Sequence, residues 1–210
     1  MLINKIVACL ILALASQFAA AGAYEDMLDA VKKNDTPAIS ALLKRGFEAN
    51  TTDQEGSTLL MVAAKEGSAG AVKTLLAARA QVNSHNQLGE TAVMLAALQG
   101  HLEIVRALVI QGAQINQPGW TPLMYAAVKG HLNISRLLIA YGAEVNAAAD
   151  NGFTALIMAA REGHAGLVSL LLAQTADVNL ATATGVTALS AARGNNHQDV
   201  VTLLIKAGAR

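Results

Sequence analysis

Hydrophobic residues recur at intervals of three and four positions along most of the chain. Within residues 102–110, for example, Leu102, Val105, Leu108 and Val109 follow this spacing, which gathers them on one face of an α-helix. Comparable apolar stretches alternate with short segments rich in Gly and Asn, which favour turns. The pattern therefore predicts many short helices joined by turns, and an all-α fold.

The apolar stretches belong to a longer internal repeat. Each repeat has a Thr that is preceded two positions earlier by Gly and followed by an Ala pair, and then by a Gly that usually precedes His. Units close with the motif Gly-Ala-x-Val/Ile-Asn, as in residues 112–116 and 142–146. The repeated threonines are Thr58, Thr91, Thr121, Thr154 and Thr187, separated by 33, 30, 33 and 33 residues. Such a period is typical of a solenoid, in which each unit buries its apolar face against its neighbours.

The most complete copy is GWTPLMYAAVKGHLNISRLLIAYGAEVN, residues 119–146, and it resembles the ankyrin repeat. The resemblance covers residues 24–210 and implies a solenoid of six helix-turn-helix units with short hairpin loops. The end units are expected to be capping repeats, because residues 24–55 lack the TPL motif and carry more charge, and because Arg193 replaces an Ala near the end. The expected ranges are 24–55 and 185–210 for the caps, with repeats at 56–88, 89–118, 119–151 and 152–184.

Two features of the repeat have specific structural consequences. The Gly after the first helix is expected to adopt a left-handed conformation, with Asn in the same slot of the first and last units. The expected left-handed residues are Gly67, Gly100, Gly130 and Gly163, together with Asn34 and Asn196. The family's TPLH His is absent, so we expect apolar packing to replace its hydrogen bonds between units. Its slot holds Met61, Met94, Met124, Ile157 and Ser190.

The first 23 residues differ from the repeats. A basic start ending at Lys5 precedes ten apolar residues, 6–15, and then a segment of small residues, as in a secretory signal peptide. A bilayer span needs about 17–25 residues, so this run is too short to cross one. We expect cleavage after Ala23, with cleavage after Ala21 as the alternative, and a periplasmic or secreted bacterial protein. Cys9, the one cysteine, lies within this leader, so the mature chain is expected to contain no disulfide.

The composition argues against several functions. The formal net charge is zero and no basic stripe is present, so neither nucleic acid nor a membrane surface is an expected partner. No nucleophile motif, phosphate-binding loop or zinc-protease motif occurs, so we expect no enzymatic activity and no cofactor. Packed helices lie about 8–10 Å apart, too far for successive histidines to share a metal. We expect these residues to bond backbone groups in the turns instead: His101, His131, His164 and His197.

One hairpin is shorter than the others. Four hairpins run eight residues from the closing Asn to the next Thr, whereas Asn116 to Thr121 runs five and contains Pro118. Trp120, the single tryptophan, lies beside it, and Phe153 occupies the equivalent position one unit later. Tryptophan often anchors protein interfaces, so we hypothesise that Pro118, Trp120 and Phe153 bind a partner. The alternative is that Trp120 only packs on its own hairpin.

The sequence therefore predicts a non-catalytic, monomeric module that binds a protein partner in the periplasm. The chain resembles small exported bacterial ankyrin proteins, some of which are linked to catalase and oxidative-stress defence, and this resemblance implies a scaffolding or protective role. The alternative is an immunity protein that neutralises a toxin enzyme acting in the periplasm.

Overall fold

The computed structural model describes residues 22–210, which form two compact units; the first ends at Gln81 and the second begins at Val82. The predicted signal peptide therefore lies almost entirely outside the described residues. The first unit contains a helix over residues 22–32, followed by α2 (Thr36–Lys44), α3 (Leu59–Glu66) and α4 (Ala69–Ala77). Helix α4 packs against both α2 and α3, and Met27, Ile39 and Leu75 are fully buried in this unit.

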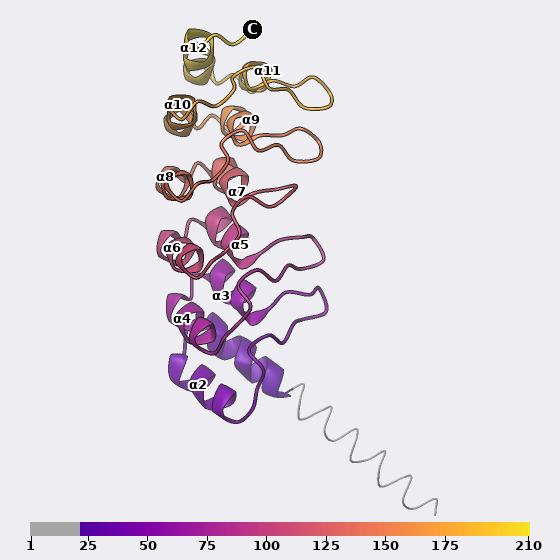
Figure 1. Ribbon diagram of the computed structural model, residues 1–210, viewed down its shortest axis with the longest axis vertical. Coiled ribbons are helices and arrows are strands. Elements are labelled where there is room, and N and C mark those ends of the chain that lie inside the picture. The colour runs from indigo at the N-terminus through magenta and orange to yellow at the C-terminus, as the bar shows by residue number, and fades with distance from the viewer. Residues whose placement is uncertain (1–21) are drawn as a thin grey trace, which may run out of the picture. The chain divides into compact units, whose positions relative to one another are not determined.

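The second unit consists of four helix pairs arranged in two layers (Figure 1). The inner layer packs the first helix of each pair against the next, and the outer layer does the same with the second helices. The inner helices are α5 (Ala92–Gln99), α7 (Pro122–Lys129), α9 (Ala155–Arg161) and α11 (Ala188–Gly194). The outer helices are α6 (Leu102–Ile110), α8 (Leu132–Ala140), α10 (Ala165–Ala173) and α12 (Gln198–Lys206). The described residues contain no β-strand, only isolated bridges. The all-α prediction is confirmed.

The repeated Thr begins the first helix of a pair. The hydroxyl oxygens of Thr58, Thr121, Thr154 and Thr187 each accept a hydrogen bond from the N–H three residues later, at 3.2–3.4 Å. This bond satisfies one of the free N–H groups at the start of the helix. Pro122 follows Thr121 as the first residue of α7, where no N–H is needed.

Left-handed residues end the first helices, as the sequence predicts. Gly67, Gly100, Gly130 and Gly163 have φ between 69° and 86°, and Asn34 and Asn196 have φ of 56° and 62°. The closing motif is less regular than the sequence analysis stated, however. Arg79 and Thr175 stand where Gly112 and Gly142 stand in other units, and both adopt positive φ values near 60°.

The core contains both the Ala pairs and most of the residues that stand in place of the TPLH His. Every Ala in the pairs beginning at 63, 96, 126 and 159 is fully buried, which allows close approach of neighbouring helices. Met61, Met94, Met124 and Ile157 are also buried, which agrees with the predicted apolar packing. The sequence analysis missed a polar role for two of them: the sulfur atoms of Met61 and Met94 each accept the N–H of the capping Thr at 3.4 Å.

Hydrogen bonds from the closing Asn residues join successive pairs within the second unit. The side-chain oxygen of Asn116 accepts the N–H of Glu144 at 2.9 Å, and its amide nitrogen donates to the carbonyl of Gly142 at 2.8 Å. Asn83 and Asn146 make the same two bonds to the following unit. These bonds fix the spacing between one closing segment and the next.

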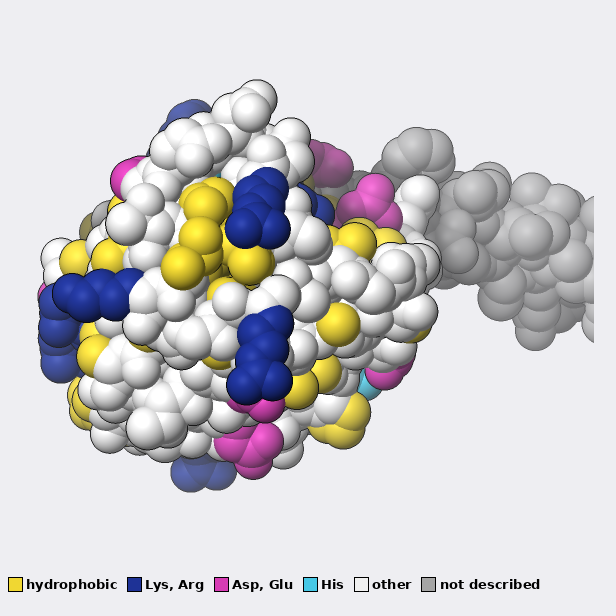
Figure 2. All heavy atoms as spheres, turned by 90° about the horizontal axis from the view of Figure 1, so that it is seen from above, with side chains coloured by type: hydrophobic (Ala, Val, Ile, Leu, Met, Phe, Trp, Pro, Cys, Tyr) yellow, Lys and Arg dark blue, Asp and Glu magenta, His cyan; other side chains and the backbone are white. Residues whose placement is uncertain are grey.

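The last pair of helices has a more polar exposed face. Ser190 and Arg193 replace the buried Met and Ala of other units, and both are exposed. Viewed from this end, the surface carries several Lys and Arg side chains among other polar groups and backbone, with smaller apolar areas between them (Figure 2). The role of residues 185–210 as a cap stays a prediction.

Candidate protein-binding site

The hairpins of the second unit project from the side of the inner helix layer (Figure 1). We call each hairpin, from its closing Asn to the next Thr, a finger. The fingers of this unit comprise residues 83–91, 116–121, 146–154 and 179–187, and the short finger is 116–121.

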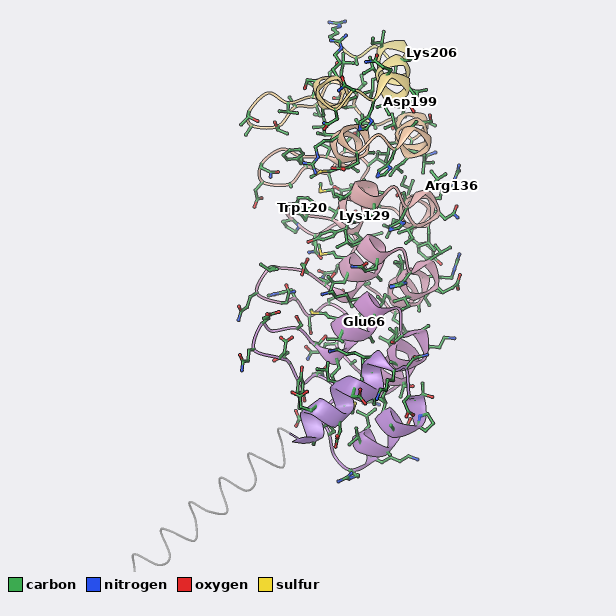
Figure 3. The ribbon with its side chains drawn as sticks, turned by 180° about the vertical axis from the view of Figure 1, so that it is seen from behind. Glu66, Trp120, Lys129, Arg136, Asp199 and Lys206 are labelled. Carbon is green, nitrogen blue, oxygen red and sulfur yellow. The ribbon has the colours of Figure 1, made fainter. Side chains whose placement is uncertain are left out.

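Trp120 lies in the short finger and remains 36% exposed (Figure 3). Its ring meets the ring of Tyr125 on α7 edge to face, with 5.3 Å between centroids and 65° between planes. Such a geometry is favourable for aromatic pairs. The Trp side chain therefore packs on the helix that follows its hairpin, and it still presents part of its ring to solvent.

Tyr125 in turn connects the short finger to the preceding one. Its hydroxyl donates to a carboxylate oxygen of Glu90 at 3.2 Å, and the other oxygen of Glu90 accepts from the side-chain amide of Asn86 at 2.9 Å. Burial of the ring, the negative charge of Glu90 and this hydrogen bond together raise the pKa of Tyr125 to about 12. A chain of contacts thus runs from Trp120 through Tyr125 and Glu90 to Asn86 in finger 83–91.

Leu88, at the tip of finger 83–91, is a candidate residue that the sequence analysis missed. Its side chain is 82% exposed. The side-chain oxygen of Asn86 accepts the N–H groups of Leu88 and Glu90 at 3.0 and 2.9 Å, so the tip is held in one conformation. The equivalent positions of the other full-length fingers are polar (Glu55, Asn151 and Thr184), and this contrast was visible in the sequence.

Pro118 lies two positions before Trp120, and Phe153 occupies the position equivalent to Trp120 one unit later. Pro118 is exposed in the short finger, and Phe153 is partly buried one unit later. The guanidinium of Arg161 lies 5.6 Å from the centroid of the Phe153 ring, within the range of a cation–π interaction, and also donates to Glu162 at 2.9 Å. No ring contact joins Trp120 to Phe153 within the described part of the chain.

The two fingers that follow the short one contact each other directly. The N–H of Ala183 donates to the carbonyl of Asn151 at 3.1 Å. Gly152 lies so close to Thr182 that an added Cβ would come within 2.7 Å of the backbone of that residue. The short finger is therefore bordered by a braced pair of fingers on one side and by finger 83–91 on the other (Figure 1).

The repeated histidines bond to backbone groups, as the sequence predicted, but not within their own turns. The Nε2 atoms of His131, His164 and His197 lie 3.1–3.2 Å from the carbonyls of Leu98, Val128 and Arg161. Because a carbonyl only accepts, Nε2 must carry the proton. These carbonyls belong to the last turn of the preceding inner helix, so the bonds join two units rather than closing the turn in which each His lies.

Residues 22–210 contain no cluster of three or more His, Cys, Asp or Glu residues that is arranged to hold a metal ion. None of the described helices has the length and apolar character needed to cross a bilayer.

Layered helix pairs with projecting hairpins define a helical repeat protein of the protein-binding class. The family model described as "Ankyrin repeats (3 copies)" matches residues 27–118, 69–149 and 144–210, which together span nearly the whole described chain. The chain therefore belongs to the ankyrin-repeat family and is a protein–protein interaction module. Ankyrin repeats are typically non-catalytic. No curated protein matches the chain.

Proposed function

We propose that this protein is exported to the periplasm, where it scaffolds or protects a partner protein, and that the short finger is its recognition site. The observation that carries the binding site is the exposed ring of Trp120, held against Tyr125 at the centre of the finger row. A ring that is fixed before binding loses little conformational entropy when a partner covers it. The predicted leader at residues 1–23 supports export.

The neighbouring side chains suit a partner surface with an apolar centre. Pro118 and Leu88 are exposed on the short finger and the finger before it, and Phe153 lies one unit further on. Exposed apolar side chains on hydrogen-bonded fingers provide the rigid anchors on which interface energy usually concentrates.

Affinity capture tests the site. The tagged full-length protein, its Trp120→Ala variant and an Ile205→Ala control are expressed in the native host and recovered with their bound proteins. Ile205 is a suitable control because it is also an exposed apolar residue, but it lies on α12. We expect one protein to be recovered with the parent and with the control, and to be depleted at least tenfold with Trp120→Ala. Equal recovery with Trp120→Ala, together with a lowered melting temperature, would show that Trp120 is only structural.

Export is tested separately by sequencing the N-terminus of the mature protein. We expect it to begin at Tyr24, and a start at Gly22 would support the alternative cleavage site. Recovery of the uncut chain from the cytoplasm would contradict export.

The role of the captured partner is then decided genetically. A scaffold or protector predicts that deleting this protein lowers the activity of its partner. An immunity protein, our second candidate, predicts that deletion is harmful only when the toxin is present.

A further inference from the structure

A second surface lies on the outer helix layer. A shallow groove of about 400 Å³ runs between α6 and α8, with Leu102 and Leu137 among its lining residues and Tyr141 at the end of α8. Tyr141 is 47% exposed although it is a large hydrophobic side chain. Arg136 on α8 points away on the side opposite Trp120, so this groove is separate from the fingers (Figure 3).

Two arginines line the groove, and neither is neutralised by a close carboxylate. Arg106 on α6 has only Glu103, at 4.0 Å, and both side chains are largely exposed, so their attraction is weak. Arg136 takes part in none of the ion pairs formed between described residues. The groove therefore combines apolar side chains with two guanidinium groups that can accept an anionic ligand.

The arginines are not a requirement of the repeat. In the other outer helices of the second unit, the residues equivalent to Arg106 and Arg136 are uncharged: Ser169 on α10 and Thr202 on α12. In the first unit, α4 has Lys73 at this position. The helix pairs α7–α8 and α9–α10 nevertheless have the same architecture. Within the second unit, the charge at this position is thus confined to the two outer helices that form the groove.

We propose that the groove between α6 and α8 binds an acidic peptide segment of a protein partner. A carboxylate of that segment pairs with Arg106 and Arg136, whose planar guanidinium groups match carboxylate geometry. An adjacent apolar side chain packs against Leu137 and Tyr141. Two cations are fewer than the about four to eight that draw a protein to an anionic membrane. Charge complementarity therefore favours a peptide over a lipid surface.

The test uses a phage-displayed library of random dodecapeptides selected on the full-length protein. The best peptides are then synthesised with a fluorescent label, each with a second version in which Asp and Glu are replaced by Asn and Gln. Binding is measured by fluorescence anisotropy to the parent protein and to R106S/R136S, which installs the Ser found in α10. The control K129S/K206S removes the same charge at exposed positions of α7 and α12 that do not line the groove.

We expect selected peptides to place Asp or Glu beside a Leu or aromatic residue. Their Kd should rise at least tenfold with R106S/R136S and with the amide version of the peptide, and less than twofold with K129S/K206S. Circular dichroism checks that each variant is folded. The proposal is overturned if selection yields no acidic peptides, if R106S/R136S binds them as well as the control does, or if vesicles containing anionic lipid bind the parent while the peptides do not. None of these outcomes depends on Trp120, so they leave the finger site to its own test.

Discussion

At the scale of single residues, Thr175 has a strained backbone conformation in the second unit. Its φ is 60°, a left-handed conformation that is unfavourable for a β-branched residue, whereas the equivalent Gly112 and Gly142 adopt such values freely. The side chain of Thr175 is exposed, and its carbonyl accepts the bond from Asn146, which a glycine would keep.

We therefore predict that Thr175→Gly raises the free energy of unfolding. Relief of left-handed strain gains about 1–2 kcal/mol, and the greater chain entropy of glycine costs about 0.5–1 kcal/mol, so the net gain is about 0.5–1 kcal/mol. Urea unfolding followed by circular dichroism measures it. Thr202→Gly, an exposed Thr in the middle of α12, should lower stability instead. Equal losses in both variants would show that Thr175 carries no strain.

The raised pKa of Tyr125 predicts that the stability of the protein changes at alkaline pH. Its pKa is raised to about 12 in the folded protein, against about 10 in an unfolded chain. A raised pKa means that folding favours the protonated form. The resulting stability is therefore complete below pH 10 and is lost as pH rises toward 12.

Trp120 reports this titration because its ring contacts Tyr125. We expect its fluorescence to change with a midpoint near pH 12, and Tyr125→Phe to remove that transition and flatten the stability between pH 10 and 12. A midpoint near 10 in the folded protein would mean that neither burial nor the contact with Glu90 perturbs the Tyr125 hydroxyl.

At the scale of elements, the closing Asn residues give a graded prediction. Asn116 makes two side-chain hydrogen bonds to the next unit, whereas Asn179 accepts one, from the N–H of Arg210 at 3.1 Å. With about 0.5–1.5 kcal/mol for each bond, Asn116→Ala should cost about 1–3 kcal/mol and Asn179→Ala about half of that. Urea midpoints compare the two. A larger loss for Asn179→Ala would refute the assignment of these bonds as links between units.

The elements themselves could be predicted because their signals are local. A capping Thr, a buried Ala pair and a left-handed Gly lie within a few residues of one another, so sequence spacing determines where each inner helix begins and ends. The left-handed conformations of Thr175 and Arg79 were not predicted. Each residue follows the end of a helix, and only the position of that helix end shows that a left-handed residue is needed there.

The candidate site was less predictable, since its contacts join residues of different units. Pro118, Trp120 and Phe153 were found from the short finger, but the bond from Tyr125 to Glu90 spans 35 positions and depends on how two fingers pack. The groove between α6 and α8 was missed for the same reason. Arg106 and Arg136 are ordinary exposed residues in their own helices, and only the pairing of those helices brings them to one groove.

At the scale of the molecule, a repeat fold has no single centre. In the second unit, α7 packs against α5 and α9, and α9 packs against α7 and α11, while Ser190 and Arg193 of α11 are exposed at the end. Each helix pair contacts only its neighbours, so stability should decline toward the end of the array.

Hydrogen exchange measured by mass spectrometry tests this expectation. The amides of α7 and α9 should exchange slowest, and those of α11 and α12 faster, because opening the last pair breaks one interface rather than two. Leu189→Ala sharpens the comparison, since this side chain is buried in α11 and its truncation costs about 2–5 kcal/mol. That loss should accelerate exchange strongly in α11 and α12, moderately in α9 and least in α7. Equal acceleration in all these helices would instead mean that the unit unfolds as one cooperative block. In that case the hydrogen bonds from His164 and His197 to the preceding inner helices couple the helix pairs more tightly than packing alone does.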